Sequence, residues 1–341
     1  MKRLALLLAA LAFAAPEPTR WRILGPGGGG SLYHPTISPH DSRIALVACD
    51  MTGAYLTRDG GAHWRIFNLG ETVRGFFFDP LNPTVYYAIA EGLFRSADAG
   101  DSWQRLYPRD AYMSTGDDHA SGSLHVAGKQ VPAVTAFAID PTDSRSLYLA
   151  QGAAFSTSFD AGVHWRAEPA LPAPARRIWV DSKSLPGDRT LYIAGPNALY
   201  IRKDGKWRTS ALPGNLTSID GAPPVFYATV AGKIHVTTDG AITWRDSALP
   251  GFRGEATVIA AAPSRPATAY VSFSRLRTLT STKWGVAKTT NAGRSWETVY
   301  DQVRDAWLTP RFGAGWAGNP IGLGVAPMDP NLAYATDSGR V

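Results

Sequence analysis

The sequence predicts an all-β protein, a β-propeller made of four-stranded antiparallel blades. Three observations predict it: one turn motif recurs along the chain, each copy follows the same series of apolar runs and turns, and helical periodicity is absent beyond the first 15 residues. The 34 glycines and 25 prolines among 341 residues also suit many short strands joined by tight turns. We expect residues 20–341 to form this single domain.

The first 15 residues have the pattern of a secretory signal peptide. Lys2 and Arg3 precede an apolar run, residues 4–12, that is too short to cross a membrane, and residues 12–14 (Ala-Phe-Ala) offer a small-x-small cleavage pattern. We therefore expect residues 1–15 to be removed and the mature protein to be secreted or periplasmic. No later segment has 18 continuous apolar residues, so no membrane association is expected, and the single cysteine, Cys49, excludes an internal disulfide.

The recurring motif is Ser/Thr-x-Asp-x-Gly-x-x-Trp. It is present in full three times, once with Asn291 in place of the aspartate, once with the glycine one place early, and once shortened by two residues. In that order the copies are residues 57–64, 96–103, 158–165, 289–296, 237–244 and 202–207. Six copies in one chain indicate a repeat architecture.

The residue types of the motif point to a structural role. A short carboxylate accepts backbone N–H bonds across a tight turn, glycine supplies a positive φ, and the tryptophan starts the next strand and buries its ring against a neighbouring unit. We therefore interpret the six side chains at the third motif position as turn residues, although carboxylates can also act in acid–base chemistry. They are Asp59, Asp98, Asp160, Asp204, Asp239 and Asn291.

The same series of segments precedes each motif, and together with the motif it makes a unit of four strands. An apolar run that often ends in Asp-Pro, such as residues 76–80 or 137–141, precedes a polar turn and a second strand, such as residues 147–150. A third strand leads into the motif, and the fourth follows its tryptophan. The unit starts near residues 36, 76, 136, 178, 217, 257 and 323. The prediction is therefore a seven-bladed propeller with six complete blades and a seventh that is truncated after its second strand.

The long insertions all fall on one face of such a propeller. The motifs connect third and fourth strands, whereas residues 107–131 and 300–320 connect one blade to the next and residues 272–285 connect second and third strands. These connections share the opposite face, where we expect a binding site. Their aromatic residues Trp284, Trp307 and Trp316 suit stacking on sugar rings, or packing of the loops against one another.

Charge and metal-ligand patterns exclude other classes of function. The net charge of +6 is spread along the chain without a basic block, so no nucleic-acid partner is expected. Asp117, Asp118, His119 and His125 share one segment, but their spacing matches no metal-binding motif. We expect neither a metal nor another cofactor.

The motif resembles the Asp-box (BNR) repeat of a β-propeller superfamily, and the start of the chain is similar to family 74 glycoside hydrolases. The N-terminal resemblance rests on residues 21–25 (WRILG), the glycines at 27–30, residues 37–39 (ISP) and residues 48–55 (ACDMTGAY). Such enzymes cleave xyloglucan with two propellers. The resemblance implies that Asp50 is a catalytic carboxylate and that Tyr55, in the same segment, contacts the substrate. Thr52 stands where the family has glycine.

The family works by inversion, which needs a second carboxylate. In the family it comes from the second propeller, which implies a further propeller domain beyond Val341. Asp337 lies in the same kind of turn as Asp50, so it is either that carboxylate or a plain turn residue, and Glu91 is a weaker candidate.

The resemblance leaves a non-catalytic alternative open. Sortilin-type receptors and photosystem-assembly propellers share the repeat and bind proteins or glycans without catalysis. Sialidases also carry it, but their Arg-Ile-Pro segment is absent from this sequence. The leading prediction is a β-glucan-cleaving hydrolase whose partner is a polysaccharide or an oligosaccharide.

Overall fold

The computed structural model describes residues 21–26, 30–50, 53–114, 122–249, 254–278, 281–302, 305, 320–338 and 340–341. Every regular element in these residues is a β-strand, so the predicted all-β class is confirmed. The expected signal peptide, residues 1–15, lies outside the described residues and remains a prediction.

Six sheets of the described chain have four strands, each hydrogen-bonded in chain order and antiparallel, as the repeat predicts. They are β1–β4 (Leu32–Ile37, Ala45–Cys49, Gly53–Thr57, Arg65–Asn68), β5–β8 (Gly75–Phe78, Tyr86–Ile89, Leu93–Ser96, Gln104–Tyr107), β12–β15 (Ala136–Asp140, Asp143–Gln151, Ala154–Ser158, Arg166–Glu168), β16–β19 (Arg177–Val180, Leu191–Ala194, Ala198–Lys203, Lys206–Ala211), β20–β23 (Leu216–Ala222, Val225–Val230, Lys233–Thr237, Arg245–Ser247) and β24–β27 (Gly254–Ala261, Ala269–Thr278, Ser281–Thr289, Glu297–Asp301).

Two smaller sheets complete the described strands. β28 (Gly322–Val325) pairs with β29 (Ala333–Thr336) as the start of a further unit. β9 (Tyr112–Met113), β10 (Leu124–Val126) and β11 (Lys129–Gln130) form a three-stranded sheet inside the insertion expected at residues 107–131.

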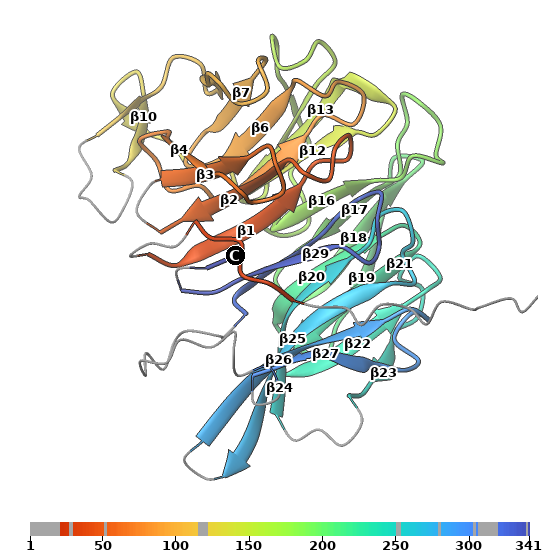
Figure 1. The fold of residues 1–341 in the computed structure, drawn as a ribbon. Helices are drawn as coiled ribbons and strands as arrows, with labels where there is room; N and C mark the ends of the chain where they lie inside the picture. The colour runs from red at the N-terminus through yellow and green to blue at the C-terminus, as the bar shows by residue number, and fades with distance from the viewer. Residues whose placement is uncertain are drawn as a thin grey trace, which may run out of the picture.

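The first strands of neighbouring sheets contact one another, so the sheets follow one another around a ring, which Figure 1 shows from the side. β1 contacts both β5 and β28, β12 contacts β16, and β24 contacts both β20 and β28. The two-stranded sheet therefore lies between β24–β27 and β1–β4 and joins the end of the chain to its start. This is the architecture of a β-propeller.

Each pair of neighbouring sheets encloses one apolar cluster. Phe76 and Tyr86 of the second sheet meet Leu46 and Leu56 of the first, for example. A further cluster closes the ring, where Tyr334 of β29 packs with Leu32 and Val47. Because the apolar side chains of a sheet are buried by its neighbours, the core is a chain of interfaces around the ring and not one central mass.

The tryptophans that end the six motifs pack into these interfaces, as predicted. The ring of Trp103 stacks on Phe67 of the preceding sheet, with 5.3 Å between ring centroids. Trp244 Nε1 donates to Ser210 Oγ at 2.8 Å, and Trp296 Nε1 donates to Ser247 Oγ at 2.8 Å; both acceptors lie in the fourth strand of the preceding sheet. Each motif thus fixes its own sheet to the one before it.

The motif turns are held by a repeated set of hydrogen bonds. In residues 96–103, the Ser96 hydroxyl donates to Asp98 Oδ1 at 2.8 Å and accepts from Gly100 N at 2.8 Å. Asp98 Oδ1 also accepts from Ser102 N at 2.9 Å. Gly100 has a φ of 88°, which explains why glycine stands at the fifth position. The carboxylate is engaged in the turn, which agrees with its predicted structural role.

Two segments differ from the sequence expectation. Residues 272–285, expected to be an insertion loop, belong to the long strands β25 and β26, which pair from Ala269↔Thr289 to Thr278↔Ser281. The segment contains several threonines, Phe273 and Trp284 and has glycine only at its last residue, a composition that suits paired strands better than a loop. β13 also begins at Asp143, so it includes most of the polar turn that was expected between the apolar run at residues 137–141 and the second strand at residues 147–150.

We expect Trp296→Ala to lower the free energy of unfolding by about 3–5 kcal/mol, because it leaves a cavity and removes the partner of Ser247. Trp296 is only 7% exposed. Chemical denaturation measures the change. Ile242→Ala is the control, since Ile242 is 71% exposed in another copy of the motif and should change stability by less than about 0.5 kcal/mol. Equal effects of both substitutions would contradict the proposed packing.

We expect the free energy of unfolding to fall as the pH drops below about 4. Hydrogen bonds from Ser102 and Ser96 lower the pKa of Asp98, and those from His63 and Thr57 lower the pKa of Asp59 to about 2. A depressed carboxyl pKa stabilises the fold above the unfolded value and loses this contribution as the pH falls through the folded value. The free energy of unfolding is measured with urea at pH 6 and at pH 3. Its decrease between the two pH values should be smaller for Asp98→Asn than for the exposed control Asp188→Asn.

Candidate functional site

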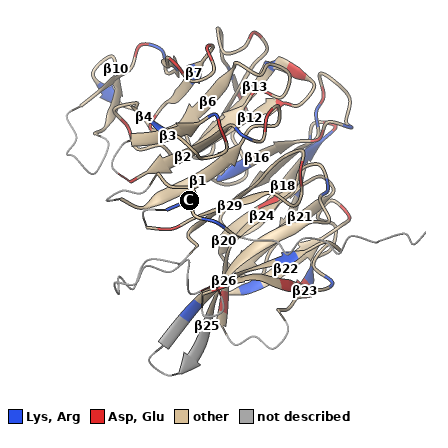
Figure 2. Ribbon diagram, in the orientation of Figure 1, with Lys and Arg blue, Asp and Glu red and all other residues tan. Residues whose placement is uncertain are grey.

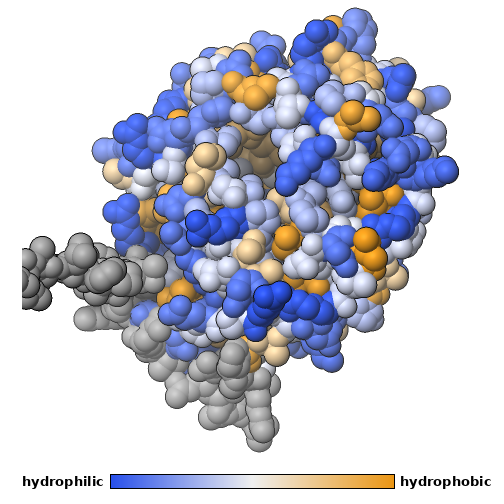
Figure 3. Space-filling model, turned by 90° about the vertical axis from the view of Figure 1, so that its right-hand side faces the viewer, coloured by the Kyte–Doolittle hydropathy of each residue, from blue (hydrophilic) through white to orange (hydrophobic). Residues whose placement is uncertain are grey.

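The candidate site lies on the face that carries the second-to-third-strand turns. Figure 1 shows the β25–β26 hairpin and the β9–β11 sheet projecting on the same side as the turn after β2. The opposite side, which faces the viewer in Figure 3, is hollowed near its centre, and its apolar residues are scattered among hydrophilic ones. The projecting hairpin and the three-stranded sheet therefore lie on the face that the sequence indicated.

Asp50 directly follows β2 and is held by the strand beside it. Its N–H donates to Ser31 O at 3.1 Å, and its half-buried carboxylate accepts a long contact from Cys49 Sγ at 3.4 Å. Gly30 lies against this carboxylate so closely that a Cβ there would stand 2.3 Å from Asp50 Oδ1. The chain before β1 therefore fixes the position of Asp50.

Tyr55 lies next to Asp50, in β3. Burial, followed by electrostatic interactions with Cys49 and Asp50, raises the pKa of its hydroxyl. Its ring packs beside the cluster that closes the ring of sheets. The structure thus brings together the two residues that the N-terminal resemblance singled out.

Asp337 follows β29 in the equivalent turn of the last sheet, but its carboxylate is paired. Arg340 Nε donates to Asp337 Oδ2 at 3.0 Å, and the Asp337 side chain is 9% exposed. Asp337 N–H also donates to Arg340 O at 3.1 Å. These contacts occupy the Asp337 carboxylate and stabilise the turn.

Asp50 and Asp337 lie on either side of the chain at the start of β1. Ser31 O accepts from Asp50 N, while Leu32 N donates to Asp337 O at 3.1 Å. Ser31 Oγ also lies 3.2 Å from Ser338 Oγ. The two turns therefore occupy one edge of the seam between the first and the last sheet.

The structure describes only some of the tryptophans that were expected to stack on sugar rings. Trp284 is half-buried at the base of the β25–β26 hairpin, where its backbone N–H donates to Gln302 Oε1 at 3.2 Å. Trp307 and Trp316 lie outside the described residues. Glu91 forms an ion pair with Arg74, and burial raises its pKa in spite of that pair.

The sequence analysis missed a polar group at the centre of the ring. Arg177 of β16 pairs with Asp220 of β20 at 2.9 Å, and the charge of Arg177 reaches His34 on β1. Because these strands are distant in sequence, no local motif could indicate this group. Asp220 Oδ2 also accepts from Ala261 N at 3.0 Å, so its carboxylate ties neighbouring first strands together.

Metal and membrane features are absent from the part of the chain that the structure describes. No three His, Cys, Asp or Glu side chains in it come together as metal ligands, and no helix in it could span a membrane. His125 stacks on Tyr112, whereas Asp117, Asp118 and His119 lie outside the described residues. Figure 2 shows basic and acidic residues spread over several sheets without one dominant patch.

Sequence comparison finds similarity to xyloglucanases. The chain is 26% identical over 260 residues to xyloglucanase Xgh74A of Acetivibrio thermocellus, which covers 69% of the chain and 27% of the relative. It is 26% identical over 283 residues to a xyloglucanase of Paenibacillus sp, covering 74% and 25%. The chain thus spans about a quarter of these relatives. No protein-family model matches it.

Structural comparison finds the same fold in proteins of two kinds. The family 74 xyloglucanase of Xanthomonas campestris aligns with a TM-score of 0.64 and 19% identity, over 94% of this chain and 53% of that one. YCF48 bound to D1 peptide aligns with a TM-score of 0.61 and 14% identity, over 98% and 97%. At these identities the likeness establishes the propeller fold alone.

We expect Gly30→Ala to displace Asp50 and to lower the melting temperature, because the new methyl group would overlap the Asp50 carboxylate. Gly53→Ala is the matched control in the same turn region, since a Cβ there meets Ile66 at an ordinary 3.6 Å. Thermal unfolding and a crystal structure of each variant measure the effect. Unchanged melting and an unmoved Asp50 in Gly30→Ala would contradict the close approach described above.

Proposed function

We propose that this chain is an exported, carbohydrate-active propeller that belongs to an inverting glycoside hydrolase acting on xyloglucan or a related β-glucan. The observation that supports this proposal most directly is the position of Asp50. It is a half-buried carboxylate beside Tyr55, on the face that carries the second-to-third-strand turns. The sequence similarity to xyloglucanases supports the same substrate class.

The proposed propeller has seven blades joined by Asp-box turns. Six four-stranded sheets, the β28–β29 sheet and the hydrogen bonds of the motif turns support this count and this turn type. The seventh blade is proposed to be partial, and a second propeller is proposed to follow it and to supply the rest of a cleft.

In the proposed reaction Asp50 acts as the general base. It removes a proton from a water molecule, whose oxygen attacks the anomeric carbon while the glycosidic C–O bond breaks. A carboxylic acid on the other side of the bond protonates the leaving oxygen. Such pairs stand about 6.5–9.5 Å apart, which leaves room for the water.

The acid partner of Asp50 is proposed to lie in the second propeller. Asp337 is the candidate within the chain, but its carboxylate is engaged by Arg340, which leaves it less free to reach the leaving oxygen of a substrate. Asp337 is therefore better suited to holding its turn in place than to acting as the acid.

Aromatic side chains are proposed to bind the polysaccharide. Tyr55 offers a ring and a hydroxyl next to Asp50, and Trp284 offers a half-buried ring at the base of the projecting hairpin. Trp307 and Trp316 are proposed to extend this platform. Residues 1–15 are proposed to direct secretion or export to the periplasm, where such a substrate is met.

A non-catalytic binding propeller is the second candidate. Two observations favour it: Asp337 is already paired, and the structural alignment with YCF48 covers nearly all of both chains. In that case the elaborated face would bind a peptide or a glycan without cleaving it.

The test is the release of reducing sugar from xyloglucan by the full-length protein and by its Asp50→Asn form. We expect the parent to release sugar and Asp50→Asn to lose about 10²–10⁴-fold in rate, as for a missing general base. Asp188→Asn, an exposed substitution on the opposite face, is the matched control and should keep full activity.

Two outcomes would contradict the hydrolase proposal. If the parent releases no sugar from any β-glucan but binds a glycan or a peptide, the binding candidate is correct. If Asp50→Asn and Asp188→Asn release sugar equally well, Asp50 takes no part in the reaction.

A further inference from the structure

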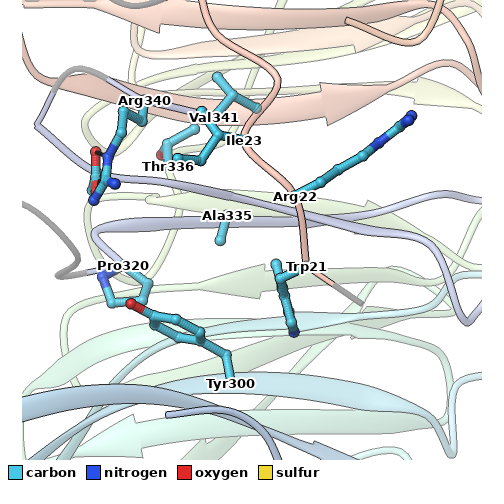
Figure 4. A pocket seen from close by; sticks show the side chains of 10 residues that line it. Trp21, Arg22, Ile23, Tyr300, Pro320, Ala335, Thr336, Arg340 and Val341 are labelled. Atoms are coloured by element: carbon cyan, nitrogen blue, oxygen red, sulfur yellow. Dashed lines mark hydrogen bonds and ion pairs between the residues drawn. The ribbon is translucent and has the colours of Figure 1, made fainter. Parts of the chain in front are cut away.

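The central channel of the ring carries polar side chains that lie outside the repeated motif. Every extensive contact between neighbouring described sheets includes a first strand, so the first strands form the wall of this channel. The channel opens as the hollow at the centre of the face that carries the motif turns (Figure 3). It is distinct from the pocket that Trp21 and Tyr300 line at the seam of the ring, because neither His34 nor Arg177 lines that pocket (Figure 4).

His34 has an unusual backbone conformation inside β1. Its φ is 52°, which is uncommon for a residue with a side chain, and the other non-glycine residues with a positive φ in the described chain lie in turns. The register of β1 and β2 shifts between Tyr33 and Thr36, so His34 occupies a β-bulge. The Thr36 hydroxyl donates to His34 O at 3.0 Å. Bulges redirect side chains, and backbone strain of this kind is found at ligand sites.

The His34 side chain is exposed although its strand belongs to the wall of the channel. No group in the described part of the chain makes a hydrogen bond with either nitrogen of its ring. A neutral imidazole has one nitrogen that donates and one that accepts. The bulge therefore presents both functions to a molecule that enters the channel.

Arg177, the first residue of β16, lies on the far wall of the channel. The first strands follow one another in the order β1, β5, β12, β16, β20, β24 and β28, which places β16 across the ring from β1. The charge of Arg177 acts on His34 over this gap. The Arg177 side chain is 46% exposed, and its Cζ lies 5.0 Å from the centroid of the Trp179 ring.

Asp220 holds the Arg177 guanidinium in place without using all of its donors. An Arg177 nitrogen lies 2.9 Å from Asp220 Oδ1, but no hydrogen bond joins the guanidinium to a group of the described chain. The Asp220 carboxylate instead accepts from Gly221 N at 2.8 Å and from Ala261 N at 3.0 Å. The N–H groups of the guanidinium therefore remain available to a ligand.

The charges at this place favour a ligand with one carboxylate. A guanidinium is a planar fork whose N–H groups match the two oxygens of a carboxylate. The negative charge of Asp220 offsets the positive charge of Arg177, so an anion with several charges, such as phosphate, is less well matched. His34 adds a donor and an acceptor for a second polar group of the same molecule.

We propose that the central channel binds a small organic acid. Its carboxylate accepts hydrogen bonds from the Arg177 guanidinium, and a hydroxyl or carbonyl group at its other end bonds the His34 imidazole. Asp220 positions the guanidinium, and the bulge in β1 positions the imidazole. The site goes beyond the proposed hydrolase activity, because neither Asp50 nor Tyr55 takes part in it.

The experiment measures the binding of two probes to the protein by NMR titration, with the backbone amides of β1 and β16 as reporters. Acetate supplies a carboxylate alone, and γ-hydroxybutyrate adds a hydroxyl at the far end. We expect both to bind, γ-hydroxybutyrate more tightly, and Arg177→Gln to weaken both by about tenfold or more. Arg43→Gln is the matched control and should bind as the parent does, since Arg43 is an exposed arginine in a turn on the motif face.

Two further variants cover the case in which Arg177→Gln does not fold. Arg177→Lys keeps a positive charge beside Asp220 but lacks the planar fork, so it should fold and bind acetate several-fold more weakly than the parent. His34→Gly removes the imidazole, and glycine adopts the positive φ of the bulge freely. It should therefore bind γ-hydroxybutyrate no more tightly than acetate.

Three results would overturn the proposal. The first is equal binding of acetate by the parent, Arg177→Gln and Arg177→Lys, or no binding of either probe at tens of millimolar. The second is a set of shifts that excludes β1 and β16. The third is tighter binding of inorganic phosphate than of either carboxylate, which would make the channel a place for an adventitious ion only.

Discussion

The contact between the first and the last sheet is the interaction on which the rest of this structure depends. The sheets bury apolar side chains against their neighbours, so the arrangement is complete only when the ring closes. Leu32 of β1 and Tyr334 of β29 belong to the cluster that closes it. Backbone bonds from Leu32 to Asp337 and from Leu24 to Val341 extend this seam along its length. An open ring would expose two sheet faces and leave the chain ends unpaired.

The same seam positions the candidate site. Ser31 binds the turn of Asp50, and the next residue, Leu32, binds the turn of Asp337, so a single strand fixes both carboxylates relative to each other. Gly30 allows the chain to pass close to the Asp50 carboxylate, where a Cβ would stand 2.3 Å from Asp50 Oδ1 and would force a shift. The chemistry proposed for Asp50 is thus tied to the closure of the fold. A change that loosens β1 would reduce stability and disturb the site together.

The sequence predicted the features that local chemistry determines. The Asp98 turn and the packing of Trp103 and Trp296 follow from residue types within one motif, and the start of each sheet follows from the apolar run before it. Features that join distant segments had no such signal. The pairing of Leu24 with Val341 depends on closure of the ring, and the ion pair of Arg177 with Asp220 depends on the contact between two neighbouring sheets. The long β25–β26 hairpin was taken for a loop because its position in the repeat outweighed the strand propensity of its residues. The pair of Asp337 and Arg340 is local, and an acidic and a basic residue three positions apart could have indicated it.

The most direct test of this account is amide hydrogen exchange at Leu32, whose N–H crosses the seam to Asp337 O. Ala256, whose N–H crosses to Gly232 O between two complete sheets, is the internal reference. A closed ring predicts that Leu32 is protected to within about tenfold of Ala256, because both bonds break only when neighbouring sheets separate. Exchange of Leu32 at the rate of an unstructured peptide, with Ala256 still protected, would show that the ring is open between its first and last sheets.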